Sequence, residues 1–199
     1  MDYKVLFCGQ YGTNTYLISD SSEAFVIDPD GDGTRVLSAL GENRLIGILL
    51  THGHFDHRGA ADYLRRMTKA PIYIGEADAQ MCRGNGDLAF LADAHVASFE
   101  PDILLRDNDK LKMGSVIVNV LHTPGHSPGS MTFEAGGYLF PGDLIFEESI
   151  GRTDFGSMSD ALASIARLMQ LYDDDTLILP GHGAPTTIGH ERSCNPYIR

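Results

Sequence analysis

Apolar residues recur along this 199-residue chain in short runs that end in turns rich in glycine, proline and polar residues. Runs of this length, bounded by such turns, are typical of β-strands. They predict strands over residues 3–7, 13–19, 24–27, 45–50 and 72–74 of the first half. In the second half we expect strands to dominate residues 111–146, with clear runs at 116–121 and 138–140, and a last strand at 177–179.

Helices are predicted between these strands. Residues 33–40 and 59–67 favour two short helices, and the spacing of Leu162, Ile165, Leu168 and Tyr172 predicts a longer one over residues 159–172. We expect residues 75–97 to be helical, with a loop at 84–86. The order of elements predicts an α/β (α+β) chain with two β-rich halves, whose strands stack as two sheets. A chain of this length, 43% hydrophobic, can bury one core, so we expect a single domain over residues 1–199.

Side chains that bind metals well follow directly after the apolar run at 45–50. They lie in the sequence Thr51-His52-Gly53-His54-Phe55-Asp56-His57. Residues one apart on an extended segment point the same way, so His52 and His54 can hold one ion together. Asp56 and His57 then face elsewhere, which indicates a second ion beside the first. The alternative, a histidine-rich surface loop, is disfavoured because further ligand-type residues recur downstream.

Three later turns each carry one such residue. His126 lies in the turn at 122–129, Asp143 in the turn at 140–143, and His182 in the turn at 179–183. Each turn follows an apolar run that favours a strand. Strand ends that converge on one edge of a sheet can build a single site.

Together these motifs resemble the metallo-β-lactamase superfamily, and within it the glyoxalase II-like (hydroxyacylglutathione hydrolase-like) proteins. The resemblance covers nearly the whole chain and includes a further motif, Gly151-Arg152-Thr153-Asp154-Phe155. It implies a four-layer αββα sandwich with a metal site at one edge. It also implies two metal ions, the first held by His52, His54 and His126, the second by Asp56, His57 and His182, with Asp143 bridging them.

The chemistry of two such ions predicts a hydrolase. Two divalent ions that share a water lower its pKa towards 7 and supply a bridging hydroxide, which would attack an activated carbonyl. Asp56 and Asp143 would have a catalytic role in orienting that hydroxide. Imidazole and carboxylate ligands without a thiolate suit zinc, our first choice, and also iron or manganese. By the resemblance, the expected substrate is a thioester, either like S-lactoylglutathione or another acyl thioester.

Other activities remain open. Persulfide dioxygenases share the fold and the Gly-Arg-Thr-Asp-Phe element but use one iron. They tend to replace the glycine beside the last histidine, whereas Gly181 and Gly183 here follow the hydrolase pattern. Lactone or β-lactam hydrolysis and a scaffold without ions are further alternatives. Hydroxyacylglutathione hydrolases continue past the last ligand with a helical extension, and this chain stops 17 residues after His182. We therefore expect a weak dependence on glutathione.

Arg152 and His122 have weaker signals. Arg152 is a candidate to bind a substrate carboxylate, although an ion pair with Asp154 that fixes the loop is slightly favoured. His122 precedes His126 by four residues and is expected to support the site rather than bind metal. His190 is expected to stabilise the C-terminal segment.

Charge and cysteine content limit the classes of binding partner and the cellular location that we expect. A net charge of −12 offers no positive field for a phosphate backbone, so we expect a small-molecule thioester as partner and no nucleic acid. No apolar run approaches the ~18 residues that span a bilayer, and the N-terminus has no secretory pattern. The three cysteines match no ligand spacing and are expected to be reduced thiols in the cytoplasm. The sequence does not predict the oligomeric state.

Overall fold

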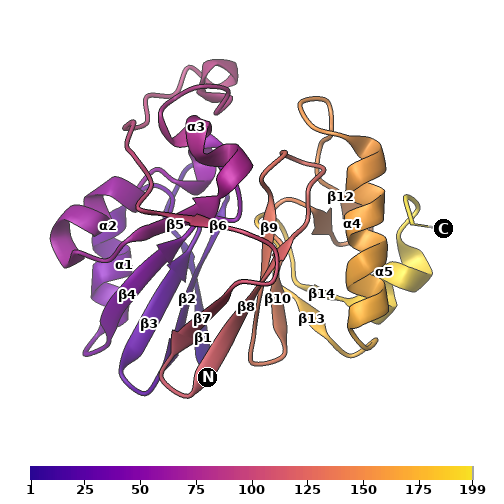
Figure 1. Ribbon diagram of the computed structural model, residues 1–199, viewed down its shortest axis with the longest axis horizontal. Helices are drawn as coiled ribbons and strands as arrows, with labels where there is room; N and C mark the ends of the chain where they lie inside the picture. Colours follow the sequence, from indigo (N-terminus) through magenta and orange to yellow (C-terminus); the bar gives the residue numbers. More distant parts are fainter. Residues whose placement is uncertain (199) are drawn as a thin grey trace.

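The structure, a computed structural model, describes residues 1–198. Two six-stranded sheets lie face to face, and helices cover the outer face of each sheet (Figure 1). This is the predicted four-layer arrangement. Strand order in the first sheet follows the chain, with β1 (Asp2–Phe7), β2 (Asn14–Asp20), β3 (Glu23–Ile27), β4 (Arg44–Leu49), β5 (Ile72–Gly75) and β6 (Ile103–Leu105).

The second sheet has the order β14-β13-β10-β9-β8-β7. Its strands are β7 (Lys110–Met113), β8 (Val116–His122), β9 (Met131–Ala135), β10 (Tyr138–Phe140), β13 (Leu177–Ile178) and β14 (Thr186–Thr187). A separate hairpin pairs β11 (Ile145–Phe146) with β12 (Ser149–Ile150).

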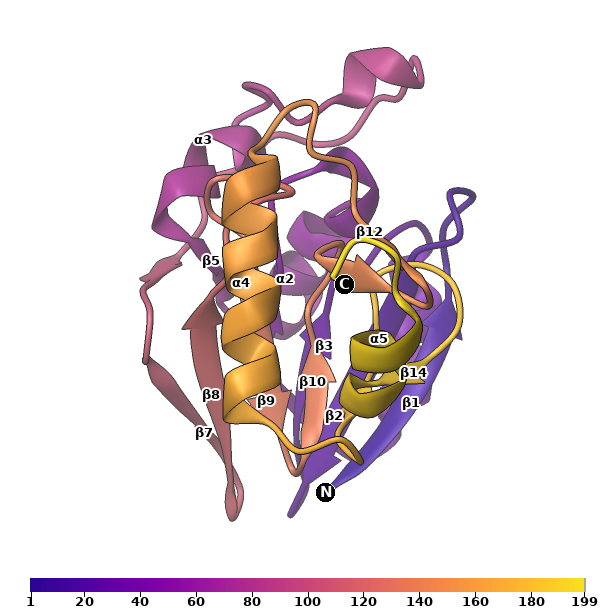
Figure 2. The same cartoon turned by 90° about the vertical axis from the view of Figure 1, so that its right-hand side faces the viewer.

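Each sheet has its own helices. The first is covered by α1 (Gly33–Leu40) and α2 (Ala61–Thr68), and α3 (Ala79–Cys82) follows β5. Figure 2 shows α4 (Met158–Leu171) and α5 (Ile188–Cys194) over the second sheet. Short 3-10 turns occur at η1 (Phe55–His57), η2 (Glu76–Asp78) and η3 (Ala89–Leu91). No helix in the described part of the chain is long and apolar enough to span a bilayer.

Three apolar cores separate the four layers. On β3, Ala24 and Val26 face the core under α1 and α2, whereas Phe25 and Ile27 face the core between the sheets. Side chains on a strand alternate between its two faces, so a strand buried on both faces needs a continuous apolar run. This explains the unbroken apolar run Ala24 to Ile27 of β3. The third core lies between the second sheet and α4 and α5.

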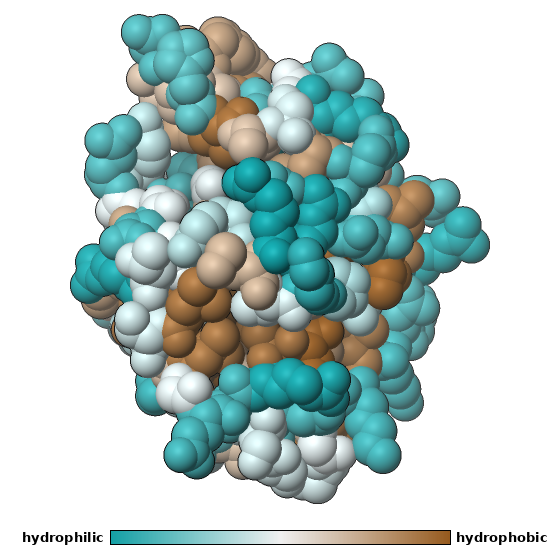
Figure 3. Space-filling view, turned by 90° about the vertical axis from the view of Figure 1, so that its left-hand side faces the viewer, coloured by the Kyte–Doolittle hydropathy of each residue, from teal (hydrophilic) through white to brown (hydrophobic). Residues whose placement is uncertain are grey.

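The outer surface is mixed in character. The face shown in Figure 3 has apolar side chains in its lower half, with hydrophilic side chains above and below them. Exposed large apolar residues in the described part of the chain include Met67 and Leu104.

Residues 75–97 differ from the prediction. Gly75 is the last residue of β5, and the rest contain only η2, α3 and η3, with no regular structure after Leu91. The predicted helical segment is therefore wrong over most of its length, because hydrogen bonds from distant residues hold its backbone in an irregular conformation. Phe55 N donates to the Asp87 carbonyl at 3.0 Å, and Arg58 Nη1 donates to the Ala97 carbonyl at 2.7 Å. Strands β6, β12 and β14 and helix α5 were not predicted. The short length of these strands, two or three residues each, explains why no pattern revealed them.

Candidate metal centre

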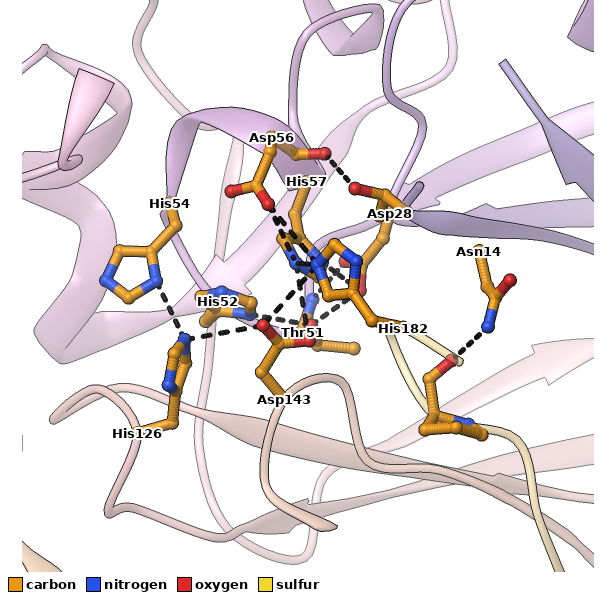
Figure 4. Close-up of polar contacts among 12 residues, drawn as sticks. Asn14, Asp28, Thr51, His52, His54, Asp56, His57, His126, Asp143 and His182 are labelled. Carbon is orange, nitrogen blue, oxygen red and sulfur yellow. Dashed lines mark hydrogen bonds and ion pairs between the residues drawn. The ribbon is translucent and has the colours of Figure 1, made fainter. Parts of the chain in front are cut away.

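The predicted ligand residues come together at the edge of the two sheets where their strands end (Figure 4). Five histidines and two aspartates from four loops converge there. The loop after β4 contributes four of them, and the loops after β8, β10 and β13 contribute one each. They are His52, His54, Asp56, His57, His126, Asp143 and His182.

Three buried histidines form the first cluster. The ligand atoms of His52, His54 and His126 lie within 4.8 Å of one another. His54 Nδ1 lies 2.8 Å from His126 Nε2, although 72 residues separate them in the chain. Three nitrogens that face one point at this spacing match the ligand set of one divalent ion.

Asp56, His57 and His182 form the second cluster. Their ligand atoms also lie within 4.8 Å of one another. His182 Nε2 lies 3.2 Å from His57 Nε2 and 3.3 Å from Asp56 Oδ2. The 3-10 turn η1 makes this possible, because it turns Asp56 and His57 away from the direction of the extended residues before them.

Asp143 faces both clusters. Its Oδ1 lies 3.4 Å from His57 Nε2. Its Oδ2 lies 3.7 Å from His126 Nε2 and 3.6 Å from His182 Nε2. One carboxylate is thus within reach of ligand nitrogens from both clusters, as a bridging group would be.

Hydrogen bonds on the far side of three rings fix which nitrogen points into the centre. His57 Nδ1 donates to Asp28 Oδ2 at 2.9 Å, and His126 Nδ1 donates to the Arg152 carbonyl at 2.9 Å. His52 Nδ1 donates to Thr51 Oγ1 at 3.0 Å. A neutral imidazole that donates from Nδ1 has its lone pair on Nε2, which is the form that binds a metal.

Two buried atoms in the centre make no hydrogen bond, and they are His52 Nε2 and Asp143 Oδ1. Burying such an atom without a partner costs free energy, and native structures rarely contain one without a reason. A cation at this point would coordinate both atoms. The residues present therefore fit a dinuclear metal centre.

The charges of the centre also favour cations. Burial would raise the pKa of the Asp143 carboxyl, but the facing imidazoles of His57, His126 and His182 hold that pKa well below its ordinary value. Burial, together with the neighbouring His126 and His57, lowers the pKa of His54 to about 3. His52 and His54 are thus neutral imidazoles, because burial and the neighbouring histidines lower the pKa of both, and the Asp143 carboxylate is ionised. These are the forms in which the three side chains bind a metal.

Asp28 is a functional residue that the sequence prediction missed. It lies directly after β3 and is buried, and its Oδ1 accepts the Thr51 N–H at 2.7 Å. Its Oδ2 accepts from Thr51 Oγ1 at 2.6 Å and from His57 Nδ1. Strands β3 and β4 are parallel neighbours, so an acid at the end of β3 lies beside the ligands at the end of β4. That adjacency is the signal that could have revealed Asp28.

Asp78 and Asn14 also hold ligand loops and were missed. Asp78, in η2, accepts from Gly53 N at 3.1 Å, Gly129 N at 2.7 Å and Ser127 Oγ at 2.5 Å. It therefore joins the loop of His52 and His54 to the loop of His126. Asn14 Nδ2 donates to the carbonyls of residues 180 and 183, each at 3.0 Å, and so fixes the turn that carries His182.

A cavity of about 230 Å³ opens onto the centre. Ligand residues and apolar side chains both line it, and so does the partly exposed Arg152. Its lining consists of His54, Phe55, Asp56, Leu88, Leu91, Ala92, His126, Asp143 and Arg152. A pocket that combines apolar side chains with a few polar ones is typical of a small-molecule site.

Arg152 and His122 have identified partners. Arg152 Nε donates to Asp154 Oδ1 at 2.9 Å, and its guanidinium lies 4.9 Å from the Phe155 ring centroid. The ion pair considered for this residue is therefore present, although its side chain also reaches the cavity. His122 Nε2 donates to the Pro128 carbonyl at 2.9 Å, in the loop that precedes β9. It belongs to neither three-residue cluster of the centre.

The chain is similar to known proteins over most of its length. The family model described as Metallo-beta-lactamase superfamily matches residues 8–182. Hydroxyacylglutathione hydrolase GloC of Haemophilus influenzae is 33% identical over 208 residues, an alignment that covers 100% of this chain and 98% of the relative.

Three solved structures are also similar. The BLEG-1 B3 metallo-beta-lactamase has a TM-score of 0.92 and 34% identity, with 99% of each chain covered. TTHA1623 in a di-iron-bound form has a TM-score of 0.88 and 31% identity, with 98% of this chain and 99% of that chain covered. ETHE1 from Myxococcus xanthus has a TM-score of 0.81 and 31% identity, with 98% and 84% covered.

Proposed function

Because this chain belongs to the metallo-beta-lactamase superfamily, whose members bind divalent metals, we propose that it is a dinuclear metal-dependent hydrolase that acts on thioesters. The observation that carries the proposal is Asp143, which faces both a three-histidine cluster and an Asp-His-His cluster. A mononuclear centre uses three or four protein ligands, and this centre has seven.

The ligand residues divide into two sets. His52, His54 and His126 would hold one ion, and Asp56, His57 and His182 the other, with Asp143 between them. We propose zinc for both, since the ligands are imidazole and carboxylate, although a related protein is described in a di-iron-bound form. When bound, the two ions would lower the pKa of a shared water and polarise a substrate carbonyl.

The side chains around the ions would orient the substrate and the attacking water. Asp56 lines the cavity, so its carboxylate can accept a hydrogen bond from a water that enters there. Leu88, Leu91 and Phe55 exclude water from the acyl group and hold it against the centre. Arg152 lines the cavity and would bind a carboxylate in the thiol portion of the substrate if it gave up its ion pair with Asp154.

A thioester is favoured over other carbonyl substrates by one relative. GloC, named a hydroxyacylglutathione hydrolase, aligns almost end to end with this chain. A glutathione thioester therefore stays among the proposed substrates.

A mononuclear iron dioxygenase acting on a persulfide is the second candidate, because the ETHE1 structure is similar over 98% of this chain. Gly181 argues against it. A Cβ at this position would lie 2.2 Å from Asp143 Oδ1, so glycine leaves room for the carboxylate between the two clusters.

A substrate panel on protein of measured metal content tests the proposal. The panel contains glutathione thioesters, other acyl thioesters, a lactone, a cephalosporin and glutathione persulfide. We expect two equivalents of metal and the highest kcat/KM on a thioester. One equivalent of iron with oxygen consumption on the persulfide would overturn the proposal in favour of the dioxygenase, and a preference for the lactone or cephalosporin would overturn the substrate class.

A further inference from the structure

A second group of metal-binding side chains lies away from this centre, where the β11–β12 hairpin meets α5. Glu148 is in the turn of the hairpin, and His190 and Cys194 are one turn apart on α5. One ligand atom from each lies within 4.8 Å of the others, and none of the three is fully buried. His190 Nε2 is 3.2 Å from Glu148 Oε1.

The geometry points to a zinc site formed by Glu148, His190 and Cys194, with water as the fourth ligand. Residues four apart on a helix face the same side, so the imidazole and the thiol are presented together. Zinc binds sulfur at about 2.3 Å and nitrogen or oxygen at about 2.0–2.2 Å, which places tetrahedral ligand atoms roughly 3.3–3.8 Å apart. The observed spacing reaches this with small side-chain rotations at an accessible surface.

A buried carboxylate holds the framework of this site in place. Glu191 is fully buried and accepts from Glu148 N at 3.0 Å, Thr186 Oγ1 at 2.6 Å and Asn195 Nδ2 at 2.8 Å. Asn195 Nδ2 also donates to the Ser149 carbonyl at 2.9 Å. The hairpin and α5 are thus joined without the side chains of Glu148 and His190. An ion pair between these two surface groups would add only about 0–1 kcal/mol to the stability of the junction. Stabilising the junction therefore does not explain why these two side chains face each other.

The backbone of Glu148 is unusual for its residue type. Its φ is 54°, in the left-handed region, where a residue other than glycine costs about 1 kcal/mol or more. The hydrogen bond from its N–H to Glu191 fixes this conformation. The strained turn places the carboxylate beside His190, where it can serve as a ligand.

Zinc at this site would cross-link the β11–β12 hairpin to α5. Binding requires the thiolate of Cys194, whose proton is released to solvent, and a neutral His190. The hairpin β11–β12 runs between Asp143 and Arg152, and Phe146 in it lies 6.4 Å from the His182 ring, centroid to centroid. The site would therefore stabilise a segment that borders the main centre. Its ligands are separate from those of that centre, so the inference does not depend on the proposed function.

Cobalt(II) distinguishes this site from the main centre. The main centre offers only imidazole and carboxylate, so a thiolate-to-cobalt charge-transfer band in the near ultraviolet reports a cysteine ligand. We expect the full-length protein to bind a third equivalent of cobalt(II) after the first two, and the band to appear with it. In C194S the band should disappear and affinity for the third zinc, measured against a chelator, should fall at least about tenfold, since only two protein ligands remain.

Cys8→Ser is the matched control, because Cys8 is a partly exposed free thiol outside the cluster. It should keep the band and the third equivalent. Glu148→Gln should keep the band but weaken the third equivalent, and two equivalents in the main centre of each variant show that it has folded. A thiolate band that never appears in the unaltered chain at saturating cobalt(II), or a band that survives C194S and disappears in C8S, would overturn the site, whatever number of ions the main centre binds.

Discussion

Replacing Asp28 with asparagine should disturb both halves of the main centre, although neither metal is expected to touch this residue. Asp28 Oδ1 accepts the Thr51 N–H, which can only donate. The amide oxygen of the introduced side chain must therefore take that place, and its NH₂ group must take the place of Oδ2. That position now accepts from His57 Nδ1 and from Thr51 Oγ1.

An NH₂ group there can only donate, which reverses two hydrogen bonds. His57 must accept at Nδ1, which moves its proton to Nε2, the atom that faces Asp143. Thr51 Oγ1 must also accept, and then it can only donate to His52 Nδ1, which moves the proton of His52 to Nε2. Each cluster thus loses the lone pair of one histidine, or keeps it at the cost of an unsatisfied hydrogen bond.

Changes behind a metal ligand typically weaken metal binding by about 10–100-fold. For each ion this is about 1.4–2.7 kcal/mol. At a fixed free zinc concentration above both dissociation constants, the same amount is lost from the stability of the loaded protein. For a domain of this size that lowers the Tm by roughly 3–11 °C for each ion.

Zinc affinity by chelator competition and Tm with and without zinc provide the assay. Asp30→Asn is the control, since Asp30 is a second buried acid on the same loop and its carboxylate makes no hydrogen bond to a histidine in the described part of the chain. Its zinc-dependent gain in Tm should match that of the unaltered protein. If Asp28→Asn retains both ions with unaltered affinity, the reasoning from fixed tautomers is wrong.

Other substitutions test the remaining assignments. Asp143→Ala should remove activity and at least one ion. His122→Ala loses one hydrogen bond to a carbonyl, so it should keep both ions and lose at most about 100-fold in kcat/KM. The reverse order of effects would show that the ligand assignment is wrong. Gly181→Ala should lower metal content, because its Cβ would lie 2.2 Å from Asp143 Oδ1. Gly183→Ala should lower only the stability of the fold, because Gly183 has a φ of 78° and no atom lies near its Cβ. Equal metal loss in both variants would refute the steric argument. Burial raises the pKa of Asp30 to about 6, so the stability from its protonated form is present below about pH 4 and lost as pH rises through 6. Asp30→Asn should therefore raise the free energy of unfolding of the metal-free protein at pH 7 by about 1–2 kcal/mol, a value that allows for partial solvent access. At pH 4 the gain should be much smaller, and urea titrations at both pH values measure it. An equal gain at both pH values would contradict this.

The elements with strong local patterns were predictable. The apolar runs of β2, β3 and β4 are mostly buried in the structure, and β8 is buried at Val118, Val120 and Leu121. The helix predicted at 159–172 is α4 within one residue at each end. Strand alternation and helical spacing are local properties, so a single sequence contains them. We predicted the convergence of the ligand loops from one further rule, which is that neighbouring strands end at the same edge of a sheet.

The missed elements depend on distant contacts. Strand β14 consists of two residues that pair with β13, and η2 supplies Asp78 to loops 25 and 51 residues away in sequence. Nothing in the local pattern of residues 75–97 distinguishes a helix from an irregular segment held by such contacts. The prediction failed there because tertiary hydrogen bonds, and not periodicity, determine the backbone.

Three buried acids show one principle that the sequence pattern does not reveal. Asp28, Asp78 and Glu191 are each almost fully buried, and each accepts three hydrogen bonds that join separate segments. A buried carboxylate is costly unless its oxygens are satisfied, so each of these acids restricts the segments around it to one arrangement. Two of them hold loops that carry ligands of the main centre. The third holds the hairpin and α5 that carry Glu148, His190 and Cys194, so the junction has the same kind of support as the main centre.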